Sequence, residues 1–139
     1  MTGAWDGKEE GAMILVVDDF EDNRDMYAEY LTFSGYRVIV ASNGQEALDR
    51  AFCDVPDLVV MDLSLPVLDG WEATRRLKAD ARTKDVPVIA LTGHALAGHS
   101  RGAKEAGCDG FIAKPCLPQA LAEMVKQMLE LKKRNLPSG

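Results

Sequence analysis

The stretch MILVVDDFEDN, Met13 to Asn23, starts as a buried strand and then changes abruptly to acidic residues. Five apolar residues, Met13–Val17, come directly before two adjacent aspartates, Asp18 and Asp19. A continuous apolar run of this length is typical of a strand that is buried on both faces of a parallel sheet. Adjacent carboxylates repel each other, and removing them from water costs free energy. Their position at the end of such a strand therefore indicates a functional site.

The composition indicates one globular domain. The chain has 139 residues, of which 47% are hydrophobic and 27% charged, enough for a single core. No apolar run reaches the roughly 18 residues that would span a bilayer, so no contact with a membrane is expected. We expect a flexible N-terminal tail at residues 1–12, a domain at 13–134 and a C-terminal tail at 135–139.

The charge argues against direct nucleic-acid binding. The formal net charge is −6, whereas nucleic-acid binding needs a basic face. The basic segment Leu131–Asn135 is better explained by the preference for cations at a helix C-terminus.

The cysteines and histidines predict neither disulfides nor a zinc site. Cys53, Cys108 and Cys116 are odd in number and widely spaced, which fits a reducing cytoplasm. His94 and His99 lie in a glycine-rich stretch and are expected in a loop or on a helix surface.

Apolar runs alternate with segments of helical period along the whole chain. The runs predict five strands, at Met13–Val17, Tyr36–Val40, Asp57–Met61, Val86–Leu91 and Gly110–Ala113. Alternating strands and helices favour a parallel sheet with helices on both faces and right-handed crossovers. The fold class is therefore α/β, a doubly wound five-stranded parallel sheet, and the common strand order for five strands is 2-1-3-4-5.

The helical segments carry recognisable start and stop signals. The first is expected to end at Gly35, and the second opens with the capping-box pattern Ser42 to Gln45. The third spans about Gly70–Ala79. The fourth, about Ala95–Ala106, is weakened by two glycines, and the last has a strong apolar stripe from Leu117 to Leu129.

Polar residues follow four of the five strands. Asp18 and Asp19 follow the first strand, Asp62 the third, Thr92 the fourth and Lys114 the fifth. In this strand order the carboxyl ends of strands 1 and 3 meet at the switch point, where ligands bind. A single aspartate at a strand end is usually a turn or capping residue. The joint placement instead predicts a Mg²⁺ site made of carboxylates, beside a hydroxyl and an ammonium group that suit a phosphoryl group.

The sequence resembles the receiver domain of two-component response regulators, with the fold known as flavodoxin/CheY-like. The resemblance covers about Met13 to Leu131. It is carried by ILVVDDF, DLVVMDLSLPVLDG, VPVIALTG and GCDGFIAKP, whose order and spacing match the family pattern.

The resemblance implies a role for each site residue. Asp62 would be the phosphoacceptor, and Mg²⁺ would be held by Asp18, Asp19, Asp62 and the backbone carbonyl of Ser64. Lys114 would contact the phosphoryl group, and Thr92 and Phe111 would be the switch residues. The bond between Lys114 and Pro115 is expected to be cis.

The chain also departs from the family pattern. Gly93 follows Thr92 where a small residue such as alanine is usual, and Phe111 lacks the hydroxyl of a tyrosine. Ser64 and His94 occupy the positions that tune dephosphorylation in receivers.

The expected function is a phosphorylation-driven switch rather than an enzyme that turns over a substrate. A histidine kinase or histidine phosphotransfer protein would dock around Phe20, Asp22, Asn23 and Pro115. The output would be a protein contact at the face formed by the fourth helix, the fifth strand and the fifth helix. The chain would be either a stand-alone receiver or a receiver domain cut from a larger hybrid kinase or regulator.

Other classes of function remain open. A flavin-binding protein of this fold needs a phosphate loop after the first strand, where Asp18 and Asp19 would repel phosphate. A phosphatase with an aspartate nucleophile would usually carry an Asp-x-Asp pattern there, which the sequence lacks. A receiver that acts as an unphosphorylated scaffold is a third possibility, and the complete acidic site argues against it.

Overall fold

The computed structural model describes residues 11–63, 68, 70–92, 107–113 and 117–135. Five strands form one parallel sheet in the order β2-β1-β3-β4-β5. Their bounds are β1 Met13–Val17, β2 Arg37–Ala41, β3 Leu58–Asp62, β4 Val88–Thr92 and β5 Gly110–Ala113. The predicted fold class and strand order are therefore confirmed.

Three strands begin one or two residues later than their apolar runs because the first residues of these runs belong to loops. The N–H of Tyr36 donates to the carbonyl of Leu31 and closes the preceding helix. Before β3, the side-chain carboxylate of Asp57 accepts from the N–H of Met13 at 2.7 Å. The N–H of Val86 donates to the carbonyl of Thr83.

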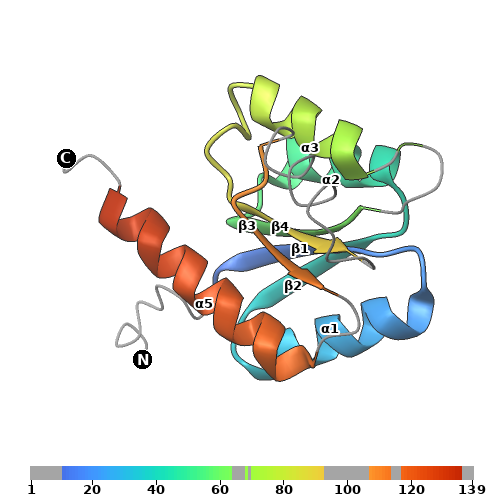
Figure 1. The fold of residues 1–139 in the computed structure, drawn as a ribbon, viewed down its shortest axis with the longest axis vertical. Helices are drawn as coiled ribbons and strands as arrows, with labels where there is room; N and C mark the ends of the chain where they lie inside the picture. Colours follow the sequence, from blue (N-terminus) through green and yellow to red (C-terminus); the bar gives the residue numbers. More distant parts are fainter. Residues whose placement is uncertain (1–10, 64–67, 69, 93–106, 114–116, 136–139) are drawn as a thin grey trace.

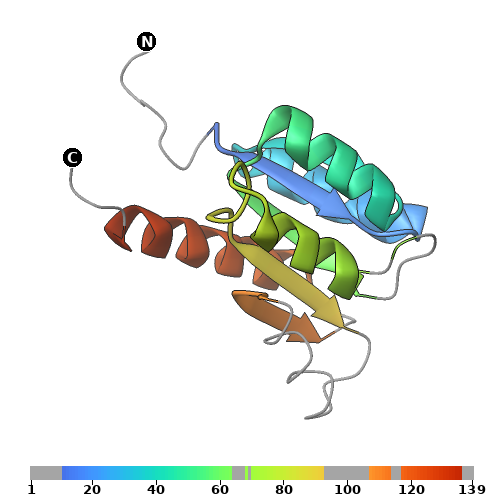
Figure 2. The same ribbon diagram turned by 90° about the horizontal axis from the view of Figure 1, so that it is seen from above.

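Within the described residues, four helices cover the sheet, and both of its faces are covered (Figure 1). They are α1 Glu21–Phe33, α2 Gly44–Asp54, α3 Gly70–Ala79 and α5 Pro118–Asn135. Helices α2 and α3 lie on one face, and α1 and α5 lie on the other, as the view from above also shows (Figure 2). The helix expected at about 95–106 falls outside the described residues, as do residues 1–10 and 136–139 of the expected tails.

The sheet separates two hydrophobic layers, and β1 contributes to both. Ile14 and Val16 pack with side chains of α1 and α5, whereas Leu15 and Val17 pack with side chains of α2 and α3. All four are fully buried. The apolar run of β1 thus belongs to a strand covered on both faces, as the sequence predicted.

The ends of two helices show how local sequence sets their length. Helix α1 stops before Gly35, whose φ of 104° lies in the left-handed region that favours glycine. The predicted cap of α2 was one residue early, because the N-cap is Asn43 rather than Ser42. The N–H of Glu46 donates to the Asn43 side chain, and the Glu46 carboxylate accepts from the N–H and hydroxyl of Ser42.

None of the helices within the described ranges is long and apolar enough to cross a lipid bilayer.

Candidate functional site

The carboxyl ends of β1 and β3 bring Asp18 and Asp62 together. The two strands are neighbours, and Val17 of β1 is in register with Met61 of β3. The residue that follows each of them is an aspartate, so the register places the two carboxylates side by side. The N–H of Asp18 also donates to the carbonyl of Ala41 at 3.2 Å, which continues the pairing of β1 with β2.

Three carboxylates converge at this edge of the sheet. Asp18, Asp19 and Asp62 each offer an oxygen, and these oxygens all lie within 4.8 Å of one another. Asp18 and Asp62 are buried, with 0% and 4% of their surface exposed, whereas Asp19 is open to solvent. A set of carboxylate oxygens with one side facing water fits Mg²⁺, which takes oxygen ligands and keeps several waters.

The turn after β1 is fixed by two hydrogen bonds that Asp18 accepts. Its Oδ1 accepts from the N–H of Phe20 at 2.9 Å, an arrangement typical of an Asx turn. Its carbonyl oxygen accepts from Nη1 of Arg24, on the first turns of α1, at 3.0 Å. Sequence reasoning did not single out Arg24, since nothing in its spacing indicates that its side chain turns back to the strand end.

Gly70, the first residue of α3, packs directly on the backbone of Asp62. A Cβ at this position would lie 2.2 Å from the Asp62 carbonyl oxygen and 2.8 Å from Cα of Leu63. Real atoms do not approach so closely, so only glycine allows α3 to begin against the end of β3. The motif that predicted the site includes this glycine, but its role as a packing contact emerges only from the structure.

The first turn of α2 carries a further acidic group, Glu46, whose ionised form is favoured. Hydrogen bonds from the N–H and hydroxyl of Ser42 lower the pKa of Glu46 below its ordinary value, against the opposing effect of burial. The charges of Arg50 and Arg24 lower this pKa further. The Arg24 guanidinium, which donates to the Asp18 carbonyl, therefore also favours the ionised form of Glu46.

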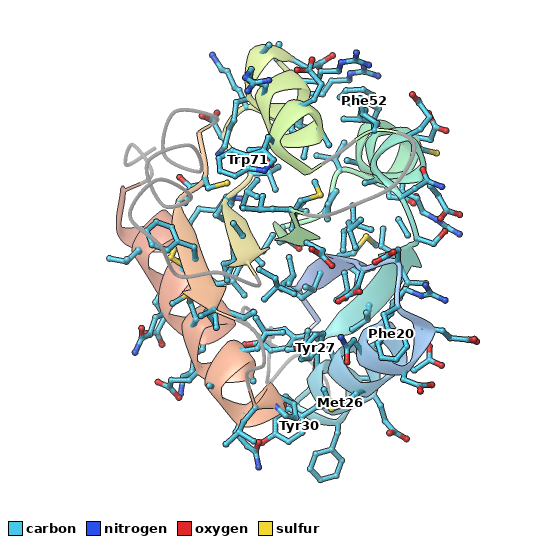
Figure 3. The ribbon with its side chains drawn as sticks, turned by 45° about the vertical axis from the view of Figure 1, so that its right-hand side comes forward. Phe20, Met26, Tyr27, Tyr30, Phe52 and Trp71 are labelled. Carbon is cyan, nitrogen blue, oxygen red and sulfur yellow. The ribbon has the colours of Figure 1, made fainter. Side chains whose placement is uncertain are left out.

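Phe111 packs in a small apolar cluster next to the acidic site. This cluster has Leu63 and Ala90 as its buried members, and Trp71, Cys108 and Phe111 pack against them. Leu63 directly follows Asp62, and Phe111 is in register with Ala90. Figure 3 shows Trp71 at the start of α3, above the end of the sheet. Burial raises the pKa of the Cys108 thiol above its ordinary value, so the thiol stays protonated at neutral pH.

Several predicted site residues lie beyond what the structure describes. Thr92 is the last residue of β4 and is in register with Ala113 of β5, but its side chain is not among the described ones. Ser64, Lys114 and Pro115 fall outside the described residues. The carbonyl ligand, the lysine contact and the cis peptide bond therefore remain predictions.

Comparison with known proteins identifies the family. The model of the response regulator receiver domain matches residues 14–126. The chain belongs to the response regulator receiver domain family. Receiver domains of this kind are signalling switches that respond to phosphorylation rather than enzymes with a conventional substrate.

Two similar proteins are matched over nearly their whole length. The polar-differentiation response regulator DivK of Brucella anthropi is 37% identical over 116 residues, which make up 84% of this chain and 94% of that protein. A CheY-like receiver domain protein from Methanospirillum hungatei JF-1 has a TM-score of 0.85 at 28% identity, covering 91% of this chain and 99% of that one.

One related structure contains a metal ion. The receiver domain of a sensor histidine kinase from Pseudomonas aeruginosa PAO1 is 35% identical, with a TM-score of 0.81, and the match covers 86% of this chain and 98% of that one. Its crystal structure has a magnesium ion coordinated in the active-site cleft.

Proposed function

We propose that Asp62 of this receiver domain accepts a phosphoryl group from a histidine kinase or a histidine phosphotransfer protein, with Mg²⁺ bound beside it. The convergence of the Asp18, Asp19 and Asp62 oxygens within 4.8 Å carries the proposal. Three carboxylates so close together repel one another unless a cation lies between them. A divalent cation there also neutralises the charge of an incoming phosphoryl group.

The three carboxylates have different tasks in this proposal. Asp19, exposed to solvent, and Asp62 bind Mg²⁺ directly, and Asp18 binds it largely through water. The backbone carbonyl of Ser64 is the further protein ligand. The metal supplies charge neutralisation, and the buried strand ends hold the carboxylates in place.

The phosphoryl transfer itself is a displacement at phosphorus. A carboxylate oxygen of Asp62 forms the new P–O bond while the P–N bond to the donor's imidazole breaks, and the imidazole keeps the electron pair and takes up a proton. The ammonium of Lys114 and the hydroxyl of Thr92 contact the transferred oxygens. Water later attacks the phosphorus of the acyl phosphate, and the bond to the Asp62 oxygen breaks, which releases inorganic phosphate and regenerates the carboxylate.

Phosphorylation is expected to reach the surface through Thr92 and Phe111. Phe111 is half-buried and packs in the same cluster as Leu63, the residue after the phosphoacceptor. The phosphoryl group shifts the balance between two arrangements of this cluster only if it binds one of them better. The output surface is the face formed by the helix expected at about 95–106, β5 and α5, where an unidentified downstream protein binds.

The phosphodonor is proposed to dock at the start of α1. Phe20 is 56% exposed, an unusual position for an aromatic side chain next to an acidic site, and Asp22 is exposed beside it. Figure 3 shows Phe20 at the N-terminal end of α1. Asn23 on the same turn and Pro115 after β5 complete the proposed surface. We place this exchange in the cytoplasm, which the free thiols of Cys53 and Cys108 support.

The decisive experiment compares phosphoryl labelling of the wild type with that of Asp62→Ala. Each protein is incubated with Mg²⁺ and a small phosphodonor such as phosphoramidate, and the mass increase is measured. Only the wild type should gain a phosphoryl group. Asp54→Ala, at the exposed end of α2, is the control and should label like the wild type. Equal labelling of the wild type and Asp62→Ala would rule out Asp62 as the acceptor.

A second experiment tests the output. Proteins from a lysate that bind the domain are compared with and without Mg²⁺ and beryllofluoride, which mimics a phosphoryl group. A partner is expected to bind one state better, and equal binding of every partner would favour an unphosphorylated scaffold instead.

An alternative context is a receiver domain within a larger hybrid kinase or regulator. The match to the receiver domain of a sensor histidine kinase favours it, whereas the match over 94% of DivK favours a stand-alone protein. The length of the genomic reading frame distinguishes the two.

A further inference from the structure

We propose that Arg24 is a positioning residue that orients Asp19 for metal binding by holding the peptide group between Asp18 and Asp19. This inference rests on the proposed Mg²⁺ site and assigns a role to a side chain that binds neither metal nor phosphoryl group. Nη1 of Arg24 donates to the carbonyl oxygen of Asp18 at 3.0 Å, in a half-buried setting.

The rigidity of the peptide bond turns this contact into control of Asp19. The carbonyl of Asp18 and the N–H of Asp19 belong to one planar group. A hydrogen bond that fixes the carbonyl therefore fixes the direction in which the chain leaves β1 and the position of the Asp19 Cα. Asp19 needs this support because its side chain is exposed, whereas burial holds Asp18 and Asp62.

The other described bonds of the turn act on either side of this peptide group rather than on its carbonyl. The N–H of Asp18 is tied to the carbonyl of Ala41, and its Oδ1 is tied to the N–H of Phe20. The first contact lies on the β1 side of the 18–19 peptide group, and the second lies on its α1 side. The bond from Arg24 is directed at the peptide group itself.

The backbone of Arg24 is anchored in α1, and its charge is felt at a neighbouring carboxylate. Its backbone N–H donates to the carbonyl of Phe20 at 3.0 Å, so its Cα belongs to the first turn of α1. Its charge acts on Glu46, whose carboxylate is fixed by Ser42 at the end of β2. Arg24 thus supports Asp19 from outside the set of proposed ligands, in the manner of the outer residues that orient ligands around a metal.

Charge and positioning predict opposite effects when Arg24 is replaced by methionine. The guanidinium is a cation beside three carboxylates, so loss of its charge alone strengthens the binding of a divalent cation. Loss of its hydrogen bond removes the restraint on the Asp18 carbonyl, so Asp19 is oriented less well, which weakens binding. If Arg24 acts by positioning, Arg24→Met binds metal about tenfold more weakly than the wild type, as expected for a residue that orients a ligand.

The test uses Mn²⁺ as the metal probe and electron paramagnetic resonance as the readout, because the signal of free Mn²⁺ reports binding directly and does not depend on phosphorylation. The matched control is Arg37→Met. Nε of Arg37 donates to the carbonyl of Gly11 at 2.6 Å. This variant therefore loses the same kind of bond, but at the amino-terminal end of the strands, away from the acidic site.

The wild type and Arg37→Met should bind Mn²⁺ equally, and Arg24→Met about tenfold more weakly. Phosphoramidate labelling of Arg24→Met should then approach the wild-type rate when Mg²⁺ is raised to saturation, which a general folding defect would not allow. Binding by Arg24→Met that equals or exceeds the wild type overturns the assignment, as does an equal loss in Arg37→Met. Absence of Mn²⁺ binding by the wild type would instead overturn the proposed metal site.

Discussion

Gly70 shows how a residue without a side chain shapes the acidic site. Helix α3 begins against the backbone of Asp62, at a distance that leaves no room for a Cβ. The contact is with backbone atoms of β3, which cannot move aside as a flexible side chain does. The position of the Asp62 carboxylate therefore depends on a glycine eight residues further along the chain.

Gly70→Ala is expected to lower the free energy of unfolding by about 2 kcal/mol, since the new methyl group forces backbone atoms apart. The shift of Asp62 should also weaken Mn²⁺ binding. Urea unfolding and a metal titration measure the two effects. Gly110→Ala is the control, because its Cβ would meet only the thioethers of Met124 and Met128, at 3.4 and 3.7 Å. An equal loss in both variants would contradict the packing argument.

At the scale of elements, the start of α2 illustrates both the reach and the limit of local sequence. The segment Ser42 to Gln45 predicts a helix start, and a helix does start there. The pattern fits two registers, however, with either Ser42 or Asn43 as the N-cap. The choice falls on Asn43 because Glu46 then reaches back to Ser42. Propensity alone does not distinguish two registers that differ by one residue.

Glu46→Gln is expected to destabilise the domain by about 1 kcal/mol at pH 7, because a neutral amide is a weaker acceptor for the Ser42 N–H than a carboxylate. Folding lowers the pKa of Glu46, so the folded state favours the ionised form. This contribution is present above the unfolded pKa and is lost as the pH falls through the lower folded value. The difference from the wild type should therefore shrink below about pH 4.

The measurement is urea unfolding of both proteins across this pH range. Asn43→Ala is the control at the same helix end. It removes the N-cap, at a cost of about 1 kcal/mol, and this cost should not vary with pH because an asparagine does not titrate there. A difference for Glu46→Gln that stays constant from pH 7 to pH 3 would show that the charge of Glu46 contributes nothing.

Asp109 joins the start of β5 to the start of β4. Its Oδ2 accepts from the N–H of Val88 and from Nζ of Lys78, both at 2.8 Å. Val88 is fully buried. Asp109→Ala is expected to cost about 1–3 kcal/mol, because it leaves the Val88 N–H without its acceptor in a dry strand. Thermal unfolding measures the loss.

Asp109→Asn provides the matched control for that prediction. The amide keeps an oxygen that can accept from the Val88 N–H. It loses only the charge that pairs with Lys78, and a cost of about 1 kcal/mol or less is expected for this solvent-accessible ion pair. If the asparagine variant were as unstable as the alanine variant, the ion pair rather than the backbone contact would join the two strands.

For the whole molecule, the sequence was sufficient to predict the topology and the convergence of three aspartates. Alternating strands and helices imply the strand order, and that order brings Asp18 and Asp62 together although 43 residues separate them in the chain. The supports of the site were not predictable in the same way. The bond from Arg24 depends on the rotamer of a long side chain, and the contact of Gly70 depends on the approach of two backbones. Both are consequences of packing that no periodicity encodes.

The same gathering of charge leads to a prediction for the stability of the whole domain. Without metal, three carboxylates within 4.8 Å of one another repel and destabilise the folded state. Asp62→Asn removes one charge from a buried position, so without metal this variant should be more stable than the wild type, by about 1–2 kcal/mol.

Mg²⁺ should reverse this order. A ligand that binds only the folded state at a hundred times its Kd adds about 2.7 kcal/mol. The wild type should show a gain of this size, whereas Asp62→Asn, with fewer charges to offer, should gain less than about 1 kcal/mol. Urea unfolding with EDTA and with saturating Mg²⁺ measures both orders, and Asp54→Asn, outside the site, should respond like the wild type. If Asp62→Asn were the less stable protein under both conditions, repulsion among the carboxylates would not destabilise the metal-free protein. Their burial would then have to be explained by hydrogen bonding within the protein alone.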